Sequence, residues 1–418
     1  MASYSGYNLD HEQTERDRPL SFHWETVDFM HLLGLPAARN AHHEATINAI
    51  VAEAILAAEA GRRVSYSARR TFYSQGRRYR GTSYTYATMM RAIALLDRTG
   101  WISDHRVPPG NRGWQSSFVA TEQLLDAWRS FGRGMTYAPA ERVCLKNDAG
   151  ELVDYRDTPL TLRIRGQLEE RNEALAELRI DLPGIERRGH HVVIGGSFVL
   201  PIPRNPLRRI FSRSSWQLHG RAYSWFQSIP NTVRLSMTVN SEPVVECDYS
   251  SLHATILYNQ VGIPFDGDAY SIDGFNRDEI KLGFNIAINA KNERAAVAAL
   301  ADHLRSDRSR SADVIAAIKR RHKPVERYFC SDAGVRLMRI DSELILTALK
   351  AVNDAGDPAL PVHDALVVPA RCAGRAQAAM SDSFERIVGR VNPCNIKIKR
   401  QIVPHMGGRP VLPSALNT

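Results

Sequence analysis

Two aspartates, each at the end of an apolar run, are the residues of this sequence best suited to chemistry. Asp248 follows Val244-Val245-Glu246-Cys247, and Asp364 follows Leu360-Pro361-Val362-His363 and precedes more apolar residues. Short apolar runs of this kind predict buried strands. Two carboxylates that converge from different strands can hold divalent cations that activate one oxygen and stabilise the departing one. We therefore expect Asp248 and Asp364 to share a metal site for phosphoryl transfer.

The ligand types at this expected site favour a hard cation. Carboxylate oxygens select Mg²⁺ or Mn²⁺ over Zn²⁺, and the sequence has no Cys/His cluster that would favour a softer metal. We expect two ions, one that lowers the pKa of a 3′-hydroxyl and one that bridges phosphates. The backbone carbonyl of Tyr249 is a further candidate ligand.

A basic helix is expected between the two aspartates. Arg277, Lys281, Asn285 and Asn289 recur at every fourth residue and therefore share one helix face, with Asn276 as the N-cap. The guanidinium fork and the ammonium group can neutralise triphosphate oxygens as pyrophosphate departs. We predict a nucleotide-binding helix, and a solvent-facing helix is the simpler alternative.

Four short motifs, in this order along the chain, resemble those of family A DNA polymerases. The matches are His219-Gly220-Arg221 with Gln227-Ser228-Ile229-Pro230 and Arg234 for the segment before the palm, Asp248-Tyr249-Ser250 for motif A, Arg277-Asp278-Glu279-Ile280-Lys281 for the start of motif B, and Val362-His363-Asp364 for motif C. The resemblance covers residues 205 to 370. It implies a right-hand palm with antiparallel strands, a fingers helix for the incoming triphosphate, and template-directed synthesis.

The resemblance and the spacing together assign roles to individual residues. Arg277 and Lys281 join Asp248 and Asp364 as expected catalytic residues. The expected nucleotide-binding residues are Arg277, Lys281, Asn285, Asn289, His253 and Tyr249. The expected DNA contacts in this part of the chain are Arg221, Gln227, Arg234, His363 and Arg339.

The sequence departs from the family pattern beside both aspartates. Ala365 stands where the family commonly has an acidic residue, so a further carboxylate would have to come from Asp341 or Glu343. His253 stands where the DNA polymerases carry a glutamate that excludes a 2′-hydroxyl. Because a bulky imidazole should block ribose sterically, we expect a preference for deoxynucleotides.

A second departure concerns the fingers helix. Asn285 and Asn289 replace the aromatic residues that the family carries there. This removes the expected stacking surface for the templating base pair, and Phe275 or Phe284 is the candidate substitute.

The N-terminal part of the chain predicts a winged helix. Helical spacing over Ala45–Ala60 and Ser83–Arg98 is followed by a strand over Trp101–Val107, a turn at Pro108–Gly113 and a returning strand over Gln115–Thr121. Such a module places a helix in a major groove and contacts phosphates with its hairpin. Because winged helices also dock proteins, that alternative stays open.

The charge balance favours a polyanionic partner. Lys and Arg number 54 against 45 Asp and Glu, which gives a formal net charge of +9. Nucleic acid suits the excess of arginine best, and an anionic membrane surface is the weaker alternative. Arg91 and Arg112 are the expected phosphate contacts of the winged helix.

Cysteine usage and hydropathy bear on the compartment. The 5 cysteines form no CxxC pair and predict free thiols in a reducing compartment. No segment approaches about 18 uninterrupted apolar residues, so we expect a cytoplasmic chain without a membrane partner.

The fold class that these patterns predict is α+β, with an antiparallel palm sheet and reduced fingers and thumb. The expected parts are a flexible arm over 1–40, a winged helix over 41–135, a helical, thumb-like connector over 136–205, and a palm with small fingers over 206–418. Within the connector, a helix is expected over Thr161–Leu178 and a single buried strand over His191–Leu200.

The function predicted from the sequence is template-directed DNA synthesis on a primer-template with nucleoside triphosphates. The segments before Asp248 are too short for a proofreading exonuclease domain. Replication or repair of a phage, plasmid or other mobile element would suit a short polymerase fused to a DNA-binding module. The alternatives are a primase or RNA polymerase of the same fold, a non-catalytic replication initiator or transcription regulator, and a metal-dependent nuclease.

Overall fold

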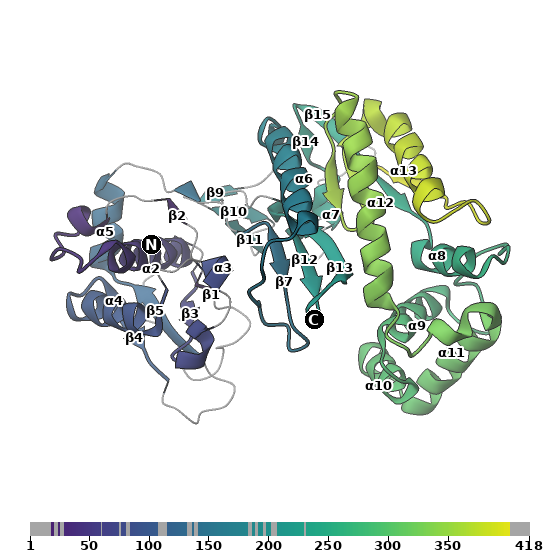
Figure 1. The fold of residues 1–418 in the computed structure, drawn as a ribbon, viewed down its shortest axis with the longest axis horizontal. Coiled ribbons are helices and arrows are strands. Elements are labelled where there is room, and N and C mark those ends of the chain that lie inside the picture. Colours follow the sequence, from purple (N-terminus) through teal and green to yellow (C-terminus); the bar gives the residue numbers. More distant parts are fainter. Residues whose placement is uncertain are drawn as a thin grey trace, which may run out of the picture. The chain divides into compact units, whose positions relative to one another are not determined.

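The computed structural model of the chain describes residues 18–20, 24–25, 29–59, 61–74, 77–80, 84–107, 115–131, 136–137, 141–182, 186–188, 191–194, 198–201, 207–229 and 231–401. The chain forms two compact units, and Figure 1 labels their helices and strands. Unit 1 comprises Met1–Glu173 and Gly184–Ile229, and unit 2 comprises Ala174–Pro183 and Pro230–Thr418. Both units combine helices with small sheets, so the fold is mixed α and β.

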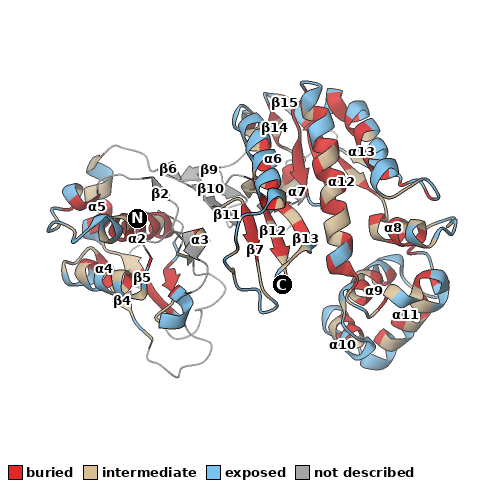
Figure 2. Cartoon of the chain, viewed as in Figure 1, coloured by how far each residue is buried: buried red, intermediate tan, exposed pale blue. Residues whose placement is uncertain are grey.

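The first part of unit 1 is built around one buried helix. Its elements are β1 (Arg18–Pro19), β2 (Trp24–Glu25), α1 (Phe29–Leu32), α2 (Ala41–Glu59), β3 (Val64–Tyr66), a 3₁₀ helix (Arg70–Ser74), α3 (Arg77–Arg80), α4 (Tyr86–Arg98), β4 (Ile102–His105), β5 (Ser116–Ala120) and α5 (Glu122–Phe131). The helix predicted over Ala45–Ala60 is confirmed by α2. Every residue of α2 from Thr46 to Ala58 is buried (Figure 2). Alanine and isoleucine make this helix apolar around its whole circumference, which is typical of a central core helix.

A four-stranded sheet packs beside α2. The strand order is β1-β3-β5-β4, with β3 and β4 antiparallel to β5. The strands predicted over Trp101–Val107 and Gln115–Thr121 are confirmed by β4 and β5, and the turn predicted at Pro108–Gly113 lies outside the described residues. Thr85 caps α4 by accepting a hydrogen bond from the Thr88 amide, which explains why the helix begins there.

The flexible arm predicted over residues 1–40 is wrong for its described C-terminal part. Phe29 and Met30 of α1, together with Leu33, are buried in the core around α2. Three apolar side chains within five positions bury enough surface to hold this segment on the domain. Residues 1–17 lie outside the described residues.

The second part of unit 1 is richer in strands than the predicted helical connector. Its elements are β6 (Thr136–Tyr137), β7 (Val143–Leu145), α6 (Pro159–Ala176), β9 (Glu186–Arg188), β10 (His191–Ile194), β11 (Phe198–Pro201), β12 (Arg208–Ser212), β13 (Ser215–Tyr223) and a 3₁₀ helix (Trp225–Ser228). The single strand predicted over His191–Leu200 is instead the hairpin β10–β11, with His191 opposite Pro201. Gly195-Gly196 interrupts the apolar run, and glycine pairs favour turns. The predicted helix over Thr161–Leu178 is confirmed by α6.

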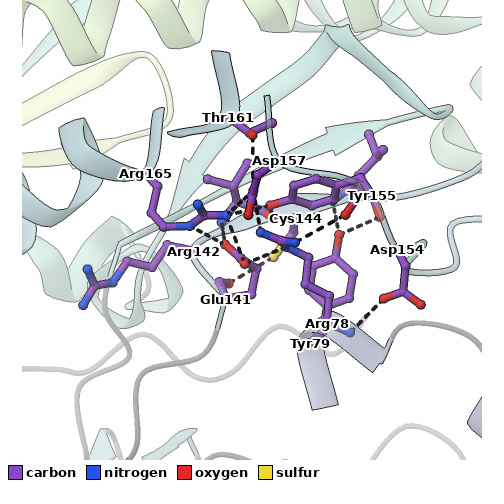
Figure 3. A network of polar contacts seen from close by, with 12 residues as sticks. Arg78, Tyr79, Glu141, Arg142, Cys144, Asp154, Tyr155, Asp157, Thr161 and Arg165 are labelled. Atoms are coloured by element: carbon purple, nitrogen blue, oxygen red, sulfur yellow. Dashed lines mark hydrogen bonds and ion pairs between the residues drawn. The ribbon is translucent and has the colours of Figure 1, made fainter. Parts of the chain in front are cut away.

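A polar network joins the two parts of unit 1 (Figure 3). The Arg78 guanidinium of α3 lies 2.9 Å from a Glu141 oxygen and 2.5 Å from Asp157. Arg165 of α6 contacts the same two carboxylates at 3.3 and 2.9 Å. These contacts cross the predicted boundary between residues 135 and 136, and both sides of that boundary belong to one compact unit. The predicted division into four parts does not follow the two compact units, and the role of each part stays a prediction.

Unit 2 consists of a six-stranded sheet and a set of helices. Its elements are β8 (Ile180–Asp181), α7 (Asn231–Arg234), β14 (Thr238–Val239), β15 (Glu242–Tyr249), α8 (Leu252–Val261), α9 (Arg277–Asn289), α10 (Glu293–Leu304), α11 (Arg308–Arg321), a 3₁₀ helix (Lys323–Tyr328), α12 (Gly334–Asp354), β16 (Leu360–Val362), β17 (Ala365–Pro369), a 3₁₀ helix (Ala370–Cys372), α13 (Ala373–Ile387) and β18 (Ile396–Lys399). The sheet order is β16-β17-β15-β14-β8, and β18 also pairs with β15. Helices α12 and α13 pack on each other, and both contact β17.

Burial explains the composition of the central strands. Every residue of β16 and β17 is buried, and so are Val244 to Cys247 of β15. Strands covered on both faces are expected to read as continuous apolar runs, which is the pattern that predicted them. Within the part of the chain that the structure describes, no helix is long and apolar enough to cross a membrane.

Candidate active site: a carboxylate pair on adjacent strands

The pairing of β15 with β17 brings the two predicted aspartates together. Asp248 on β15 lies opposite Ala365 on β17, and Asp364 is the residue immediately before Ala365. Directly opposed Cα atoms in an antiparallel pair are about 4.5 to 5.5 Å apart. Asp364 occupies a two-residue turn with His363, whose φ of 53° lies in the left-handed region. The tight turn therefore holds Asp364 at the end of the strand, next to Asp248.

The electrostatics of Asp248 reflect the second carboxylate beside it. Burial raises the pKa of Asp248, and the negative charge of Asp364 raises it further. Lys399 opposes both effects but does not outweigh them. Like charges held together in a partly buried place are a common arrangement at sites that bind a cation or transfer a proton.

Lys399 is a member of this site that we did not predict. Its Nζ lies 2.5 Å from a carboxylate oxygen of Asp248 and 2.9 Å from Oε1 of Glu246. Burial alone would lower the pKa of Lys399, but its bonds to the two carboxylates outweigh burial and raise it. The alternation Ile396-Lys397-Ile398-Lys399 indicates a strand with one basic face, which is the signal that could have drawn attention to it.

Arg234 has a structural place, which corrects its predicted role as a DNA contact. Its guanidinium lies 2.8 Å from Oε2 of Glu246, and both residues are buried. Burial alone would raise the pKa of Glu246, but Lys399 and Arg234 outweigh burial and lower it. Because Glu246 holds Arg234 in the interior, its guanidinium is not presented to a nucleic-acid backbone.

The residues of the pair fit a hard divalent cation. Among the described residues, no three His, Cys, Asp or Glu side chains group as a metal site, so a cation here would take its side-chain ligands from the two aspartates. Carboxylate oxygens suit Mg²⁺ or Mn²⁺. A cation between Asp248 and Asp364 would relieve the repulsion that raises the pKa of Asp248.

Arg277 on α9 belongs to the surroundings of the pair. Tyr270 is buried, hydrogen-bonds to Ser251, and is influenced electrostatically by both Arg277 and Asp364. The Arg277 guanidinium carbon lies 5.5 Å from the centre of the Tyr270 ring. Tyr270 thus connects the carboxylate pair with the first turn of the predicted nucleotide-binding helix.

The Arg277 side chain already carries a carboxylate partner. Its Nε lies 2.5 Å from Asp268 Oδ2 and its Nη2 lies 3.2 Å from Oδ1. The hydrogen bond from Arg277 lowers the pKa of Asp268. A two-pronged contact of this kind is the geometry in which a guanidinium binds phosphate oxygens. Lys281, one turn further along α9, is exposed, and its side chain has no hydrogen bond or ion pair among the described residues.

Asn289 has structural partners on α9 and α12, and its predicted role in nucleotide binding stays a prediction. It lies 12 residues after Arg277 on α9, and 12 residues rise about 18 Å along a helix. Its Nδ2 donates to the Asn285 carbonyl at 2.7 Å. Its Oδ1 packs so closely on α12 that a Cβ at Gly334 would lie 2.0 Å from it. The contact of Asn289 is with α12, and Asn285 is the nearer of the two asparagines to Arg277.

The candidate aromatic substitutes have other partners. Phe284 is fully buried and packs against Tyr270, His322 and Phe329, so it offers no stacking surface to a base. Phe275 has the Arg310 guanidinium over its ring at 4.9 Å. The proposal that Phe284 replaces the missing aromatic platform is therefore wrong.

His253 is held by an unexpected acidic partner. Its Nε2 lies 3.1 Å from Oδ2 of Asp341, which is 0% exposed. Asp341 was a candidate third carboxylate, and its burial against His253 argues against that role. Arg339, a predicted DNA contact, forms an ion pair with Glu343 one turn further along α12, and only 17% of its side chain is exposed.

The Tyr249 side chain points into the core rather than toward a nucleotide. Its hydroxyl donates to the Met380 carbonyl at 2.5 Å, and its ring packs against Phe384. Only its backbone carbonyl could therefore serve as a metal ligand. His363 is exposed, which leaves its predicted contact with DNA as a prediction.

The remaining predicted DNA contacts lie in unit 1. Arg91 is exposed on α4, Arg221 is on β13, and Arg112 lies outside the described residues. Gln227 is used locally, because its Nε2 donates to the Ala222 carbonyl at 3.0 Å. The predicted roles of Arg91, Arg112 and Arg221 remain predictions.

Comparison with known proteins yields little. No family model and no curated protein matches the chain. Among solved structures, the chain is similar to the POL domain of Pol1 from M. smegmatis, determined in complex with DNA primer-template and dNTP. The identity is 14%, the match covers 58% of this chain and 52% of that chain, and the TM-score is 0.31. The chain thus spans about half of that structure.

Proposed function

We propose that the chain is a nucleotidyltransferase that extends a DNA strand on a template. The observation that carries this proposal is the convergence of Asp248, on β15, with Asp364, in the turn before β17, and the link from Arg277 to them through Tyr270. Paired carboxylates beside an arginine fork form a site suited to a nucleoside triphosphate and its divalent cation. The motifs that resemble family A DNA polymerases support the same activity.

Each residue of the site has a defined task in this proposal. Asp248 and Asp364 hold a divalent cation, which, when bound, lowers the pKa of the attacking hydroxyl and offsets phosphate charge. Arg277 exchanges Asp268 for phosphate oxygens, since both ligands suit the same fork. Lys281 is exposed one turn further and adds a second positive charge for the leaving pyrophosphate.

Sugar selection is assigned to His253. The bond to Asp341 holds the imidazole in one orientation, because a buried carboxylate accepts the Nε2 proton. A ring fixed in this way cannot swing aside for a ribose 2′-hydroxyl. We therefore propose deoxynucleotides as substrates.

Unit 1 is proposed to bind duplex DNA as a winged helix. The order α2, β3, α4, β4, β5, with β5 between β3 and β4 in the sheet, is the order of that module. Arg39 and Arg91 are both exposed, and both lie near enough to His43 to lower its pKa together with burial. This cluster of positive charge on the N-terminal side of α2 is suited to phosphates.

Primer extension tests the proposed activity. The full chain is given a primed single strand, Mg²⁺ or Mn²⁺, and either dNTPs or NTPs. We expect extension with dNTPs, and a rate at least about 10³-fold lower for Asp364→Asn, because one carboxylate of the cation site is lost. Asp354→Asn is the matched control, since Asp354 is an exposed acid paired with Lys350 on α12.

The alternatives predict other outcomes of the same assay. Extension with NTPs indicates a primase or RNA polymerase. Shortening of the DNA without nucleotides indicates a nuclease. Retained DNA binding without any synthesis, unaffected by Asp248→Asn or Asp364→Asn, indicates a non-catalytic initiator or regulator.

A further inference from the structure

Three charged side chains form a ladder across β15 and β18 beside the carboxylate pair. Glu246 and Asp248 are two residues apart on β15 and therefore share one face of the sheet. Lys399 lies opposite Glu246 in the register of β18, and its Nζ bridges Glu246 and Asp248 at 2.9 and 2.5 Å. The ammonium thus stands directly against a predicted metal ligand.

Glu246 is a buried and fixed partner for this lysine. It is 2% exposed, and its second oxygen is occupied by Arg234 at 2.8 Å. Oε2 of Glu246 accepts a hydrogen bond from Arg234, and Oε1 accepts one from Lys399. A surface lysine would move freely, but two carboxylates on one strand fix the position of this ammonium.

The lysines of β18 limit how much further positive charge the site can accept. Besides Lys399, which contacts Asp248, the basic residue Lys397 lies opposite Asp248 in the register of β18 and therefore on the same face of the sheet. A second divalent ion would have to bind against these two lysines and the first ion.

We propose that Lys399 is a resident cation of the active site, which takes the place of one of the two metal ions expected from the sequence. This inference rests on the proposed function, because it assumes that Asp248 and Asp364 bind a divalent cation. Lys399 acts as a positioning residue: it holds Asp248 and restricts the carboxylate pair to one ion.

Titration of the full chain with MnCl₂, followed by the electron paramagnetic resonance signal of free Mn²⁺, tests the proposal. We expect wild type to bind one Mn²⁺ that Asp364→Asn abolishes. Lys399→Met should bind a second ion, or bind the first about tenfold more tightly, because a repelling charge is removed. Lys399→Arg should behave as wild type.

Controls separate a local effect from a general one. Lys350→Met removes an exposed lysine from an ion pair elsewhere in unit 2 and should titrate as wild type. Circular dichroism melting shows whether each variant is folded, and Lys399→Gln replaces Lys399→Met if the latter is not.

The outcomes distinguish this inference from the proposed function. A wild-type chain that binds two ions, both lost in Asp364→Asn, overturns the inference alone. So does a folded Lys399→Met or Lys399→Gln chain with wild-type affinity and stoichiometry. Mn²⁺ binding unchanged in Asp364→Asn overturns the metal site, and with it the proposed function.

Discussion

Two charge clusters, one in each unit, use similar residues in different ways. In unit 1, Arg78 and Arg165 share Glu141 and Asp157, so two cations meet two carboxylates. In unit 2, Arg234 and Lys399 bond to Glu246, Lys399 also contacts Asp248, and Asp364 lies beside Asp248. The first cluster is balanced, with each carboxylate meeting two cations, whereas in the second Asp248 has a carboxylate as well as a cation beside it.

The pKa values of the carboxylates express this difference. Hydrogen bonds from Arg78 and Arg165 lower the pKa of Asp157 to about 2. Burial and Asp364 raise the pKa of Asp248. A carboxylate whose pKa is lowered in the folded state stabilises the fold at neutral pH. A carboxylate whose pKa is raised destabilises the fold at neutral pH, and a bound cation can offset this effect. The pKa of Asp157 and that of Asp248 thus shift in opposite directions.

The largest expected effect is on the stability of unit 1. Glu141→Gln leaves Arg78 and Arg165 without their least exposed partner, and removal of one charged member of a partly buried network costs about 3 kcal/mol. Urea denaturation at neutral pH measures this loss. Glu169→Gln is the control, because Glu169 pairs with Arg142 but is half exposed. Equal stability of the two variants would show that the balanced cluster does not hold unit 1 together.

His322 in unit 2 extends the comparison to a buried group without an ionic partner. Burial lowers its pKa to about 4, whereas an unfolded chain takes up the proton near pH 6.5. Neutral His322 therefore makes its full contribution to the free energy of unfolding above pH 6.5. This contribution decreases by about 3 kcal/mol as the pH falls toward 4. Its Nε2 donates to the Ala269 carbonyl at 2.8 Å, so Nδ1 is the site that must take the proton.

The measurement for His322 is a series of denaturation curves between pH 7 and pH 4. His322→Gln should lower stability at pH 7 and reduce the dependence on pH below 6.5. The exposed residue His303 on α10 serves as the control, and His303→Gln should leave the curve unchanged. A wild-type slope in His322→Gln would assign the acid sensitivity to other groups.

Replacing Asp248 with asparagine should change the free energy of unfolding in the opposite direction from replacing Asp157. Because the folded pKa of Asp248 is raised, its charged form costs stability at neutral pH, and this cost disappears as the pH falls through that pKa. In a metal-free buffer, Asp248→Asn should therefore keep or raise the free energy of unfolding at pH 7 while abolishing primer extension. Asp157→Asn should lower it, because that contribution is lost only as the pH falls toward about 2. Destabilisation by Asp248→Asn would place this aspartate with the structural cluster.

The sequence was informative where a local pattern determines the outcome. Asp248 and Asp364 stand at the ends of apolar runs, and the strands that carry them are neighbours in an antiparallel sheet. The N-cap at Asn276 and the start of α9 at Arg277 also follow from local spacing, since Asn276 accepts from the amides of Asp278 and Glu279. Such features depend on a few consecutive residues.

The sequence was uninformative where a side chain's partner comes from a distant element. Lys399 meets Glu246 only through the register of β18 on β15, and register is set by the whole sheet. Arg234 and Arg339 were predicted to contact DNA from the resemblance and the spacing, but Glu246 and Glu343 neutralise them. The His253–Asp341 pair likewise depends on the packing of α8 against α12.

The smallest expected effect concerns the positive cluster of unit 1. If Arg91 contacts a phosphate, Arg91→Ala should weaken duplex binding several-fold at low salt and reduce the slope of log affinity against log salt by about 1. Fluorescence anisotropy over a salt series measures both quantities. Arg129→Ala is the control, because Arg129 is exposed on α5 but lies 2.6 Å from Asp126. A salt slope unchanged by Arg91→Ala would assign the exposed face of α4 to protein docking. The carboxylate pair of unit 2 would then be the only part of the proposed function that needs nucleic acid.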